Sequence, residues 1–231
     1  MIQNLILGDC LEELSKIPDN SIDLILTDPP FGITSCEWDI IIPFDKLWKE
    51  YYRIIKLNTA IILFSSQPFT TKLINSNINN FKYVWIWNKK SISNPQLAKF
   101  QPLKCHEEIC VFSNGKIPYF PQGVMSCSKM RKKDTGTLGA TVRKAYEQTT
   151  TGYPKSILEF SVERVFHPTQ KPVKLLEYLI KTYTNEENSI ILDSCAGSGS
   201  TLVAAKNLNR RFIGIEKEER YFNIAKTRLS L

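Results

Sequence analysis

The feature that most constrains the fold of this chain is a series of seven short, mostly apolar runs. Such runs are typical of strands that are covered on both faces, as in a parallel sheet. Helical patterns lie between many of them: Leu175, Leu176 and Leu179 share one helical face after Pro172. The runs occupy residues 5–7, 22–26, 60–64, 83–87, 109–112, 190–192 and 212–215. This alternation predicts an α/β fold with a doubly wound, mostly parallel, seven-stranded Rossmann-like sheet.

The alternation stops in the middle of the chain. Residues 115–166 are rich in Gly, Ser, Thr, Lys and Arg and contain few apolar runs, which indicates an insertion that decorates the core. A chain of 231 residues suits one α/β domain with such an insertion. We therefore predict a core domain of residues 1–114 and 167–231 and an inserted region of residues 115–166.

Positive charge is concentrated in the same middle segment. The formal net charge is +7, and between Lys116 and Lys171 there are ten basic residues against four acidic ones. Basic side chains on a flexible segment suit contact with nucleic-acid phosphates, although a charge run is often only a solvated loop. The candidate DNA-binding residues are Lys129, Arg131, Lys132, Lys133, Arg143 and Lys144.

The six cysteines are scattered without regular spacing, and no secretory leader precedes them. This pattern favours a reduced, cytoplasmic protein. Cys105, His106 and Cys110 lie close together, but no second pair has the spacing of zinc ligands, so we expect no metal site. No apolar stretch approaches the roughly 20 residues that cross a bilayer, so we expect no membrane partner.

A glycine turn joins an apolar run to a helical pattern near the end of the chain, from Asp193 to Thr201. Glycines in such a turn let the backbone approach a ligand closely. The next apolar run ends in Glu216, whose carboxylate can accept both hydroxyls of a ribose. This pattern indicates a nucleoside ligand. A dinucleotide is disfavoured because Leu202 stands where the third glycine would be, and a simple tight turn is the other interpretation.

A second motif, Asp28-Pro29-Pro30-Phe31, ends an apolar run about 165 positions earlier. Two successive prolines fix an extended backbone and remove two N–H donors. A carboxylate, a carbonyl and an aromatic ring are thus presented together, which suits a planar aromatic amine. Its two N–H groups can bind Asp28 and the Pro29 carbonyl while Phe31 stacks on the ring. Taken alone, the motif is also compatible with an ordinary strand-ending turn.

Together these motifs make the chain resemble the β-class S-adenosylmethionine-dependent DNA amino-methyltransferases, the adenine-N6 and cytosine-N4 family. In that class the amine-holding motif precedes the target-recognition region, and the donor loop comes last. The residues that carry the resemblance are Gly8-Asp9, the run from Thr27 to Gly32, the run from His167 to Pro172, the run from Leu192 to Thr201, and Gly214-Ile215-Glu216. The resemblance implies a methyltransferase sheet with an inserted target-recognition segment.

The resemblance also implies roles for individual residues. Asp28, Pro29, Pro30 and Phe31 are the implied catalytic set. Asp9 contacts the adenine amine of the donor, Glu216 its ribose, and Gln170 and Lys171 lie near its carboxylate. The implied cofactor-binding set is Asp9, Gln170, Lys171, Asp193, Ser194, Cys195, Ala196, Gly197, Gly199, Ser200, Thr201 and Glu216. S-adenosyl-L-methionine is the implied cofactor.

The hypothesis from sequence is therefore a DNA adenine-N6 methyltransferase that flips its target base. Within the resemblance, an aspartate heading the Pro-Pro-aromatic motif favours adenine, and Asp28 fits that pattern. A cytosine-N4 methyltransferase is the nearest alternative. An RNA-modifying enzyme, a catalytically silent DNA-binding module and a nicotinamide-dependent oxidoreductase are more distant ones.

Double-stranded DNA is the expected partner. The inserted region is short for target recognition, so the hypothesis includes readout that is shared with a second subunit, as in a homodimer. A cognate restriction enzyme is a further partner that it allows.

Overall fold

The computed structural model describes residues 3–34, 36, 38–132, 145–163, 165–166 and 170–230. Contacts within the chain divide it into two compact units. One comprises Met1–Phe120 with Ser156–Leu231, and the other comprises Pro121–Lys155. Each unit is described separately below.

The first unit is built on a sheet of eight strands in the order β1-β10-β9-β2-β3-β5-β4-β8. The neighbouring strands from β1 to β3 are parallel, and β5 is antiparallel to both β3 and β4. The strands are β1 (Gln3–Leu7), β2 (Ile22–Thr27), β3 (Ile55–Ser65), β4 (Phe81–Asn88), β5 (His106–Ser113), β8 (Ile157–Glu159), β9 (Ile190–Asp193) and β10 (Arg211–Glu216). The predicted doubly wound, mostly parallel sheet is confirmed, and each of the seven apolar runs lies in a strand of this sheet.

One strand of the sheet is not expected from sequence. β8 pairs in parallel with the end of β4 and lies inside the segment predicted as an insertion. It has only three residues, of which Leu158 alone is buried, so it carries too little apolar pattern to be recognised.

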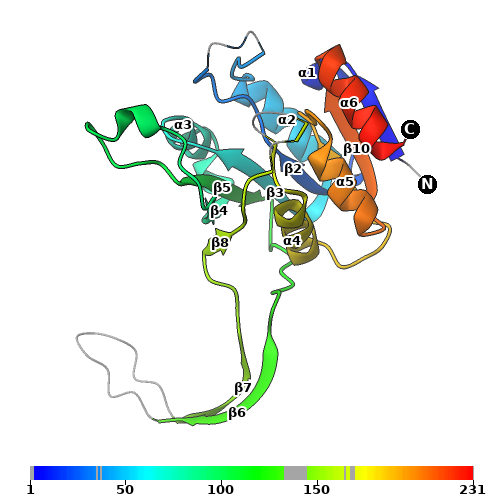
Figure 1. The fold of residues 1–231 in the computed structure, drawn as a ribbon. Helices are drawn as coiled ribbons and strands as arrows, with labels where there is room; N and C mark the ends of the chain where they lie inside the picture. The colour runs from blue at the N-terminus through cyan, green and yellow to red at the C-terminus, as the bar shows by residue number, and fades with distance from the viewer. Residues whose placement is uncertain are drawn as a thin grey trace. The chain divides into compact units, whose positions relative to one another are not determined.

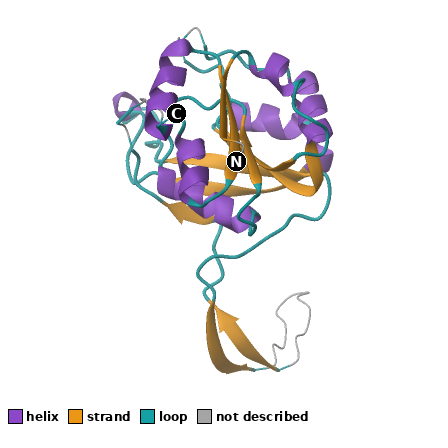
Figure 2. Cartoon of the chain, turned by 90° about the vertical axis from the view of Figure 1, so that its right-hand side faces the viewer, coloured by secondary structure: helices purple, strands orange, loops and turns teal. Residues whose placement is uncertain are grey.

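Helices cover both faces of this sheet (Figure 2). They are α1 (Cys10–Leu14), α2 (Phe44–Ile54), α3 (Phe69–Ser76), α4 (Val173–Tyr183), α5 (Ser200–Asn207) and α6 (Glu219–Leu229), with short 3₁₀ turns η1 (Ile78–Asn80) and η2 (Pro95–Leu97). Residues of α1, α2 and α3 form one core with one face of the strands, and residues of α4, α5 and α6 form another core with the opposite face.

The alternation of β-strand side chains explains this two-sided core. In β2, Leu24 and Leu26 join the core beneath α4 and α5, whereas Ile25 joins the core beneath α1 and α2. Successive side chains of a strand point to opposite faces, so a strand covered on both sides must be apolar at every position. This requirement is why the runs in the sequence are continuous instead of alternating.

The strand directions place the candidate residues on one edge of the sheet. Because β2, β9 and β10 are parallel neighbours, their carboxyl ends meet at the same edge (Figure 1). Asp28 follows β2, Asp193 ends β9 and Glu216 ends β10. Ligands of open α/β sheets bind at this edge.

The second unit is a two-stranded antiparallel hairpin of β6 (Met125–Arg131) and β7 (Tyr146–Thr151). Most of its side chains are exposed or only partly buried. Polar side chains link the strands: Arg131 Nε donates a hydrogen bond of 2.7 Å to Gln148 Oε1. An isolated hairpin buries little apolar surface, so it suits a contact element better than an independent core.

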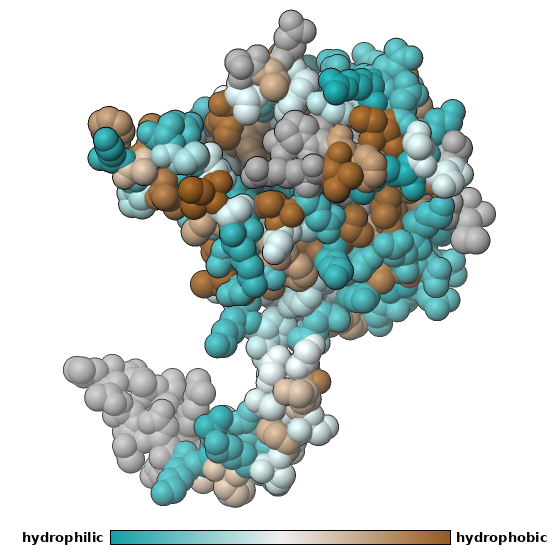
Figure 3. Space-filling view, viewed as in Figure 1, coloured by the Kyte–Doolittle hydropathy of each residue, from teal (hydrophilic) through white to brown (hydrophobic). Residues whose placement is uncertain are grey.

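The surface of the chain is mixed in character. On the face shown in Figure 3, hydrophobic residues stand in small groups between hydrophilic ones. Among the helices of the described residues, none is long and apolar enough to cross a membrane.

Candidate functional site

The two sequence motifs meet directly at the carboxyl edge of the sheet. β2 and β9 are parallel neighbours, so Asp28 and Ser194 follow adjacent strand ends. Thr27 Oγ1 accepts a hydrogen bond of 3.1 Å from the backbone N–H of Ser194. The Ser194 hydroxyl in turn lies 2.6 Å from the Tyr51 hydroxyl on α2. A buried hydrogen-bond network thus joins segments that are 167 positions apart in sequence.

The backbone after the two prolines is held by one carboxylate, that of Asp39. Its two oxygens accept hydrogen bonds of 2.7–2.9 Å from four successive backbone N–H groups, of Phe31, Gly32, Ile33 and Thr34. Burial acts to raise the pKa of Asp39, but the hydrogen bonds from Thr34 and the loop backbone outweigh it and lower the pKa. Gly32 has a φ of +66°, which L side chains rarely adopt, so this turn requires glycine.

Phe31 lies at the start of this turn. Its ring stacks on the Phe69 ring of α3, with 5.0 Å between ring centroids and an interplanar angle of 27°. The sequence interpretation assigns Phe31 to the target base, and it does not include Asp39 in the site. A single acidic residue in a loop carries no signal of its own, although four N–H groups after two prolines need an acceptor.

Asp28 is one end of a chain of alternating charges. Its Oδ2 accepts a hydrogen bond of 2.5 Å from Lys171 Nζ, which also lies 3.4 Å from Glu107 Oε2. Glu107 Oε1 lies 3.2 Å from Lys89 Nζ. The Lys171 side chain is only 8% exposed, and its Nζ lies 5.1 Å from the centre of the Phe64 ring. Glu107 and Lys89 cannot be recognised from the sequence as members of the site, because no local motif indicates a partner that comes from another strand.

This cluster shifts the pKa values of its members in opposite directions. Burial raises the pKa of Asp28, and the Lys171 ammonium opposes that rise. Burial also acts against the charged form of Lys171, but Asp28 and Glu107 outweigh it and raise the pKa of Lys171. For Glu107, Lys171 and Lys89 outweigh burial and lower the pKa. Lys171 is therefore a charged side chain held between two carboxylates.

Within the described part of the chain, two oxygens of the cluster lack a hydrogen-bond partner: Glu107 Oε2, which still lies 3.4 Å from the Lys171 ammonium, and one oxygen of Asp28. Oδ1 is buried and has no hydrogen-bond partner among the described residues, although Oδ2 is occupied by Lys171. A buried carboxylate oxygen without a donor costs free energy, and such an atom in a native structure points to a missing ligand group. Its open position is available for an N–H donor.

The donor loop starts at Asp193, which is 3% exposed. Its Oδ1 accepts a hydrogen bond of 3.1 Å from the Cys195 backbone N–H. Burial raises the pKa of Asp193 to about 7, although a hydrogen bond from the Thr201 side chain opposes the rise. The neighbouring Cys10 thiol and burial raise the pKa of Cys195.

The glycines of this loop have different surroundings. Gly199 has a φ of +79°, and a Cβ there would come within 2.9 Å of Ala225 on α6. Gly197 has a φ of +53°, and nothing lies within 4 Å of where its Cβ would be. Gly199 therefore serves the packing of the loop on α6, whereas Gly197 borders open space. Ala196 precedes this space, and Ser200 and Thr201 begin α5 as buried residues.

Glu216 closes the loop from the next strand. Its Oε2 accepts a hydrogen bond of 2.6 Å from the Gly197 N–H, and its Oε1 accepts one of 2.8 Å from the Glu218 N–H. Burial raises the pKa of Glu216. Each oxygen has a second lone pair, so the carboxylate can still accept from a ligand hydroxyl.

The other two predicted donor residues lie in different places. Asp9 caps the first turn of α1, where its Oδ1 accepts from the Leu11 N–H at 3.0 Å. Gln170 is 7% exposed, and its Oε1 accepts from the Phe166 N–H at 3.1 Å. The preceding motif residues His167, Pro168 and Thr169 lie outside the described residues.

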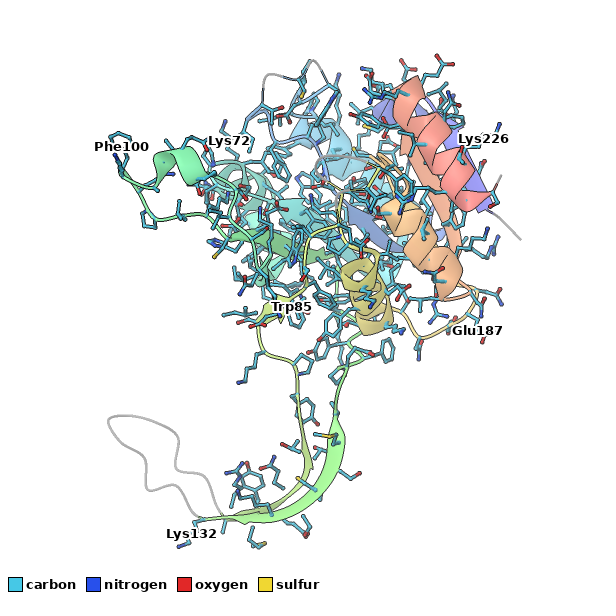
Figure 4. The ribbon with its side chains drawn as sticks, viewed as in Figure 1. Lys72, Trp85, Phe100, Lys132, Glu187 and Lys226 are labelled. Atoms are coloured by element: carbon cyan, nitrogen blue, oxygen red, sulfur yellow. The ribbon has the colours of Figure 1, made fainter. Side chains whose placement is uncertain are left out.

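Three of the candidate DNA-binding residues are described, and they fall in the second unit. Lys129 and Arg131 lie on β6, and Lys132 follows that strand (Figure 4). Lys133, Arg143 and Lys144 lie outside the described residues. Among the residues that the structure does describe, no group of three or more His, Cys, Asp or Glu side chains could hold a metal ion.

Comparison with known proteins gives one family. A family model described as DNA methylase, for N6 and N4 methyltransferases, matches residues 22–227. Over 249 residues the chain is 27% identical to the type II methyltransferase M.HpaI of Haemophilus parainfluenzae, and the match covers 99% of this chain and 74% of that protein.

Solved structures agree with this result. The complex of M1.HpyAVI with SAM superimposes with a TM-score of 0.67 at 26% identity, and the match covers 99% of this chain and 100% of that one. The cytosine-N4-specific PvuII DNA methyltransferase gives a TM-score of 0.71 at 18% identity, over 97% of this chain and 85% of that one. At that identity the PvuII enzyme supports the fold alone.

Proposed function

Because the chain belongs to the N6/N4 DNA methylase family, we propose that it transfers a methyl group from S-adenosylmethionine to the N6 amine of adenine in duplex DNA. The match covers nearly the whole chain, which confirms the family that the sequence motifs indicated. The enzyme is a DNA methyltransferase, and its cofactor is S-adenosylmethionine. The choice of base and the roles of individual residues are the parts we propose.

One observation carries the proposal: Asp28 presents an open buried oxygen beside the donor loop. Its Oδ1 has no partner among the described residues, and the preceding residue, Thr27, hydrogen-bonds to Ser194 in that loop. An exocyclic amine bound at Asp28 therefore lies next to the loop that the family uses for the methyl donor. Proximity of two reactants accounts for much of the rate enhancement in group transfer.

The acceptor residues act on the nitrogen of the base. Asp28 Oδ1 and the Pro29 carbonyl accept its two N–H groups, which favours a pyramidal nitrogen and frees its lone pair. Phe31 supports the ring of the base, with its own position fixed by Phe69. After attack the nitrogen is cationic and acidic, so a proton can pass from it to Asp28 Oδ1, whose pKa burial has raised.

The donor residues fit S-adenosylmethionine. Gly197 borders open space, and Glu216 retains lone pairs for ribose hydroxyls at the end of β10. Asp9 is assigned to the donor adenine and Gln170 to the methionine end. When bound, the cofactor supplies an electrophilic methyl carbon on a sulfonium, which leaves as a thioether. The Asp193 loop holds and orients it.

Adenine is preferred over cytosine as the acceptor. The head of the amine-holding motif is Asp28, and within this family an aspartate there favours adenine whereas a serine favours cytosine. Both bases offer an exocyclic amine with two N–H groups, so the carboxylate alone does not separate them. Cytosine N4 is therefore the second candidate, and the product decides between them.

The second unit is assigned to duplex DNA. Its exposed basic residues Lys129, Arg131 and Lys132 suit phosphate contacts, and the inserted region of residues 115–166 is the target-recognition region of this proposal. A homodimer, a cognate restriction enzyme and a reducing, cytoplasmic location belong to the same proposal.

The product tests the function. The protein is expressed in a bacterial host that lacks adenine-N6 and cytosine-N4 methylation, and the DNA is digested to nucleosides for mass spectrometry. We expect N6-methyladenine with the wild-type protein and none with Asp28→Ala. N4-methylcytosine would overturn the choice of base, and DNA without either product would overturn the proposed reaction.

A further inference from the structure

Lys171 connects the acceptor site at the end of β2 to β5, which lies two strands away in the sheet. It precedes α4, yet its ammonium lies between Asp28 after β2 and Glu107 on β5, with the Phe64 ring of β3 beneath it. β3 separates β2 from β5 in the sheet, so the Lys171 side chain spans a whole strand. Among the described residues, no hydrogen bond or ion pair joins the Lys171 side chain to the donor loop.

We propose that Lys171 is a positioning residue for the acceptor: it binds Oδ2 of Asp28 and thereby leaves Oδ1 as the oxygen that receives the amine. This inference rests on the proposed function. It differs from the role that the family resemblance implies for Lys171, which is to contact the carboxylate of the donor. Glu107 and Lys89 support this position of Lys171. Glu107 forms an ion pair with the Lys171 ammonium on the side away from Asp28, and Lys89 forms an ion pair with Glu107.

The chemistry requires Asp28 to be ionised. A protonated carboxyl would donate one hydrogen bond and so would compete with the amine N–H for an acceptor. Burial favours the protonated form of Asp28, and an ammonium at 2.5 Å opposes this by favouring the charged form. Lys171 can do so only while it is itself charged, and Glu107 favours that state.

The charged groups that face Asp28 act on its pKa in different directions. The charged groups around it are Lys171 before α4, Glu107 on β5, Asp39 in the loop after β2 and Asp193 at the end of β9. Lys171 lowers the pKa of Asp28, whereas Glu107 raises it. Removing these two charges should therefore move the ionisation of Asp28 in opposite directions, which a purely structural role for the cluster does not require.

The test is the pH dependence of kcat for methylation of duplex DNA, with donor affinity measured separately by calorimetry. With Lys171→Met we expect kcat to fall at least tenfold near neutral pH and the acidic limb to move up by about one unit or more. The dissociation constant for S-adenosylmethionine should stay within twofold. With Glu107→Gln the acidic limb should move down. Lys171→Arg keeps the positive charge and should keep the limb near its wild-type position.

A matched control comes from α4, the helix that follows Lys171. Lys174→Met makes the same chemical change at an exposed position of α4 and should alter neither kcat nor the limb. Glu107→Gln is nearly isosteric. It therefore tests the direction in which a neighbouring charge shifts the pKa of Asp28 even if Lys171→Met does not fold.

Two outcomes would overturn the inference. One is a Lys171→Met variant with an unchanged acidic limb and at least tenfold weaker donor binding, which would place Lys171 at the donor carboxylate. The other is a Glu107→Gln variant whose limb moves up together with that of Lys171→Met. A wild-type protein that methylates no base would instead refute the proposed function, so the two failures are distinguishable.

Discussion

The donor loop and the acceptor loop lie on adjacent strands, but they hold their carboxylates in different ways. Glu216 accepts from two backbone N–H groups, of Gly197 and Glu218. Asp28 instead accepts from a lysine side chain that comes from a distant segment, and it leaves one oxygen open. The donor carboxylates are fixed by the backbone around them, whereas the acceptor carboxylate depends on a network of side-chain charges.

The difference suits the two ligands. The donor changes only at its sulfonium, which becomes a thioether when the methyl group leaves, so its adenosine and methionine parts suit a rigid cradle that backbone groups can provide. The acceptor amine changes from neutral to cationic during the reaction, so its partner must respond to charge. Substitutions on the two sides should therefore separate the chemical step from donor binding.

The largest effect is expected on the acceptor side. Asp28→Ala removes the open oxygen and should lower kcat by about 100- to 1,000-fold, as the loss of a group that stabilises the transition state does. Donor affinity should stay nearly intact, because Glu216 and the donor loop are unchanged. Single-turnover methylation and calorimetry measure the two quantities.

The exposed Asp45 on α2 provides a matched control, since Asp45→Ala makes the same change outside the site. Retention of more than about a tenth of wild-type turnover by Asp28→Ala, which is a barrier change of under roughly 1.4 kcal/mol, would contradict the role of Asp28.

A smaller effect is expected on stability through Asp193. Its pKa is raised to about 7 in the folded protein, above its ordinary value, so the folded state is disfavoured once the group ionises. The stability present at pH 4 should therefore decrease as the pH rises through 7. Asp193→Asn cannot ionise and should exceed the wild type by on the order of 2 kcal/mol at pH 8, with little difference at pH 4.

Thermal unfolding without cofactor measures this pH dependence, and the size of the chain makes the expected gain several degrees. If the difference in stability between the two proteins is constant from pH 4 to pH 8, the pKa of Asp193 is not raised in the folded state.

On the donor side, the substitution of Glu216 should weaken cofactor binding more than it slows turnover. Glu216→Ala removes the acceptor for the ribose hydroxyls and also the hydrogen bond to the Gly197 N–H. We expect the dissociation constant for S-adenosylmethionine to rise about tenfold, since hydrogen bonds to a charged acceptor contribute roughly 1.5–3 kcal/mol each before the loop relaxes. The turnover of the saturated enzyme should change far less than in Asp28→Ala.

Isothermal calorimetry gives the donor affinity directly. The exposed Glu219, at the start of α6, offers a control of the same residue type. An unchanged dissociation constant for Glu216→Ala would place the ribose elsewhere and would remove the contrast between the two loops.

The sequence predicts most of the sheet and both loops. Continuous apolar runs mark the strands, because strands covered on both faces must be apolar at every position. The donor turn and the Asp28 motif are local patterns, so their place at strand ends is visible in the sequence, and the family they indicated is confirmed.

The parts that the sequence does not predict are those set by packing. Asp39 binds four N–H groups across a loop, and Glu107 meets Lys171 only because β5 lies next to β3 in the sheet. In the sequence, the surroundings of Asp39 and Glu107 are no different from those of an acidic residue that is exposed to solvent. The pairing of β6 with β7 is also not predicted, because most of its side chains are polar and none of them is buried.

The smallest effect is expected in the second unit. Its basic side chains are exposed, whereas the charged groups of the two loops belong to buried networks. Neutralising Arg131, Lys132 and Lys133 together should weaken binding to duplex DNA and flatten its salt dependence by about one slope unit for each phosphate that is no longer bound. Affinity for S-adenosylmethionine should not change, since the donor residues lie in the other unit. Replacing the exposed Lys46, Lys49 and Lys226 on α2 and α6 makes an equal change in net charge and serves as the control. A slope of log affinity against log salt that is equal in the two triple variants would show that these three charges act only through the net charge of the protein.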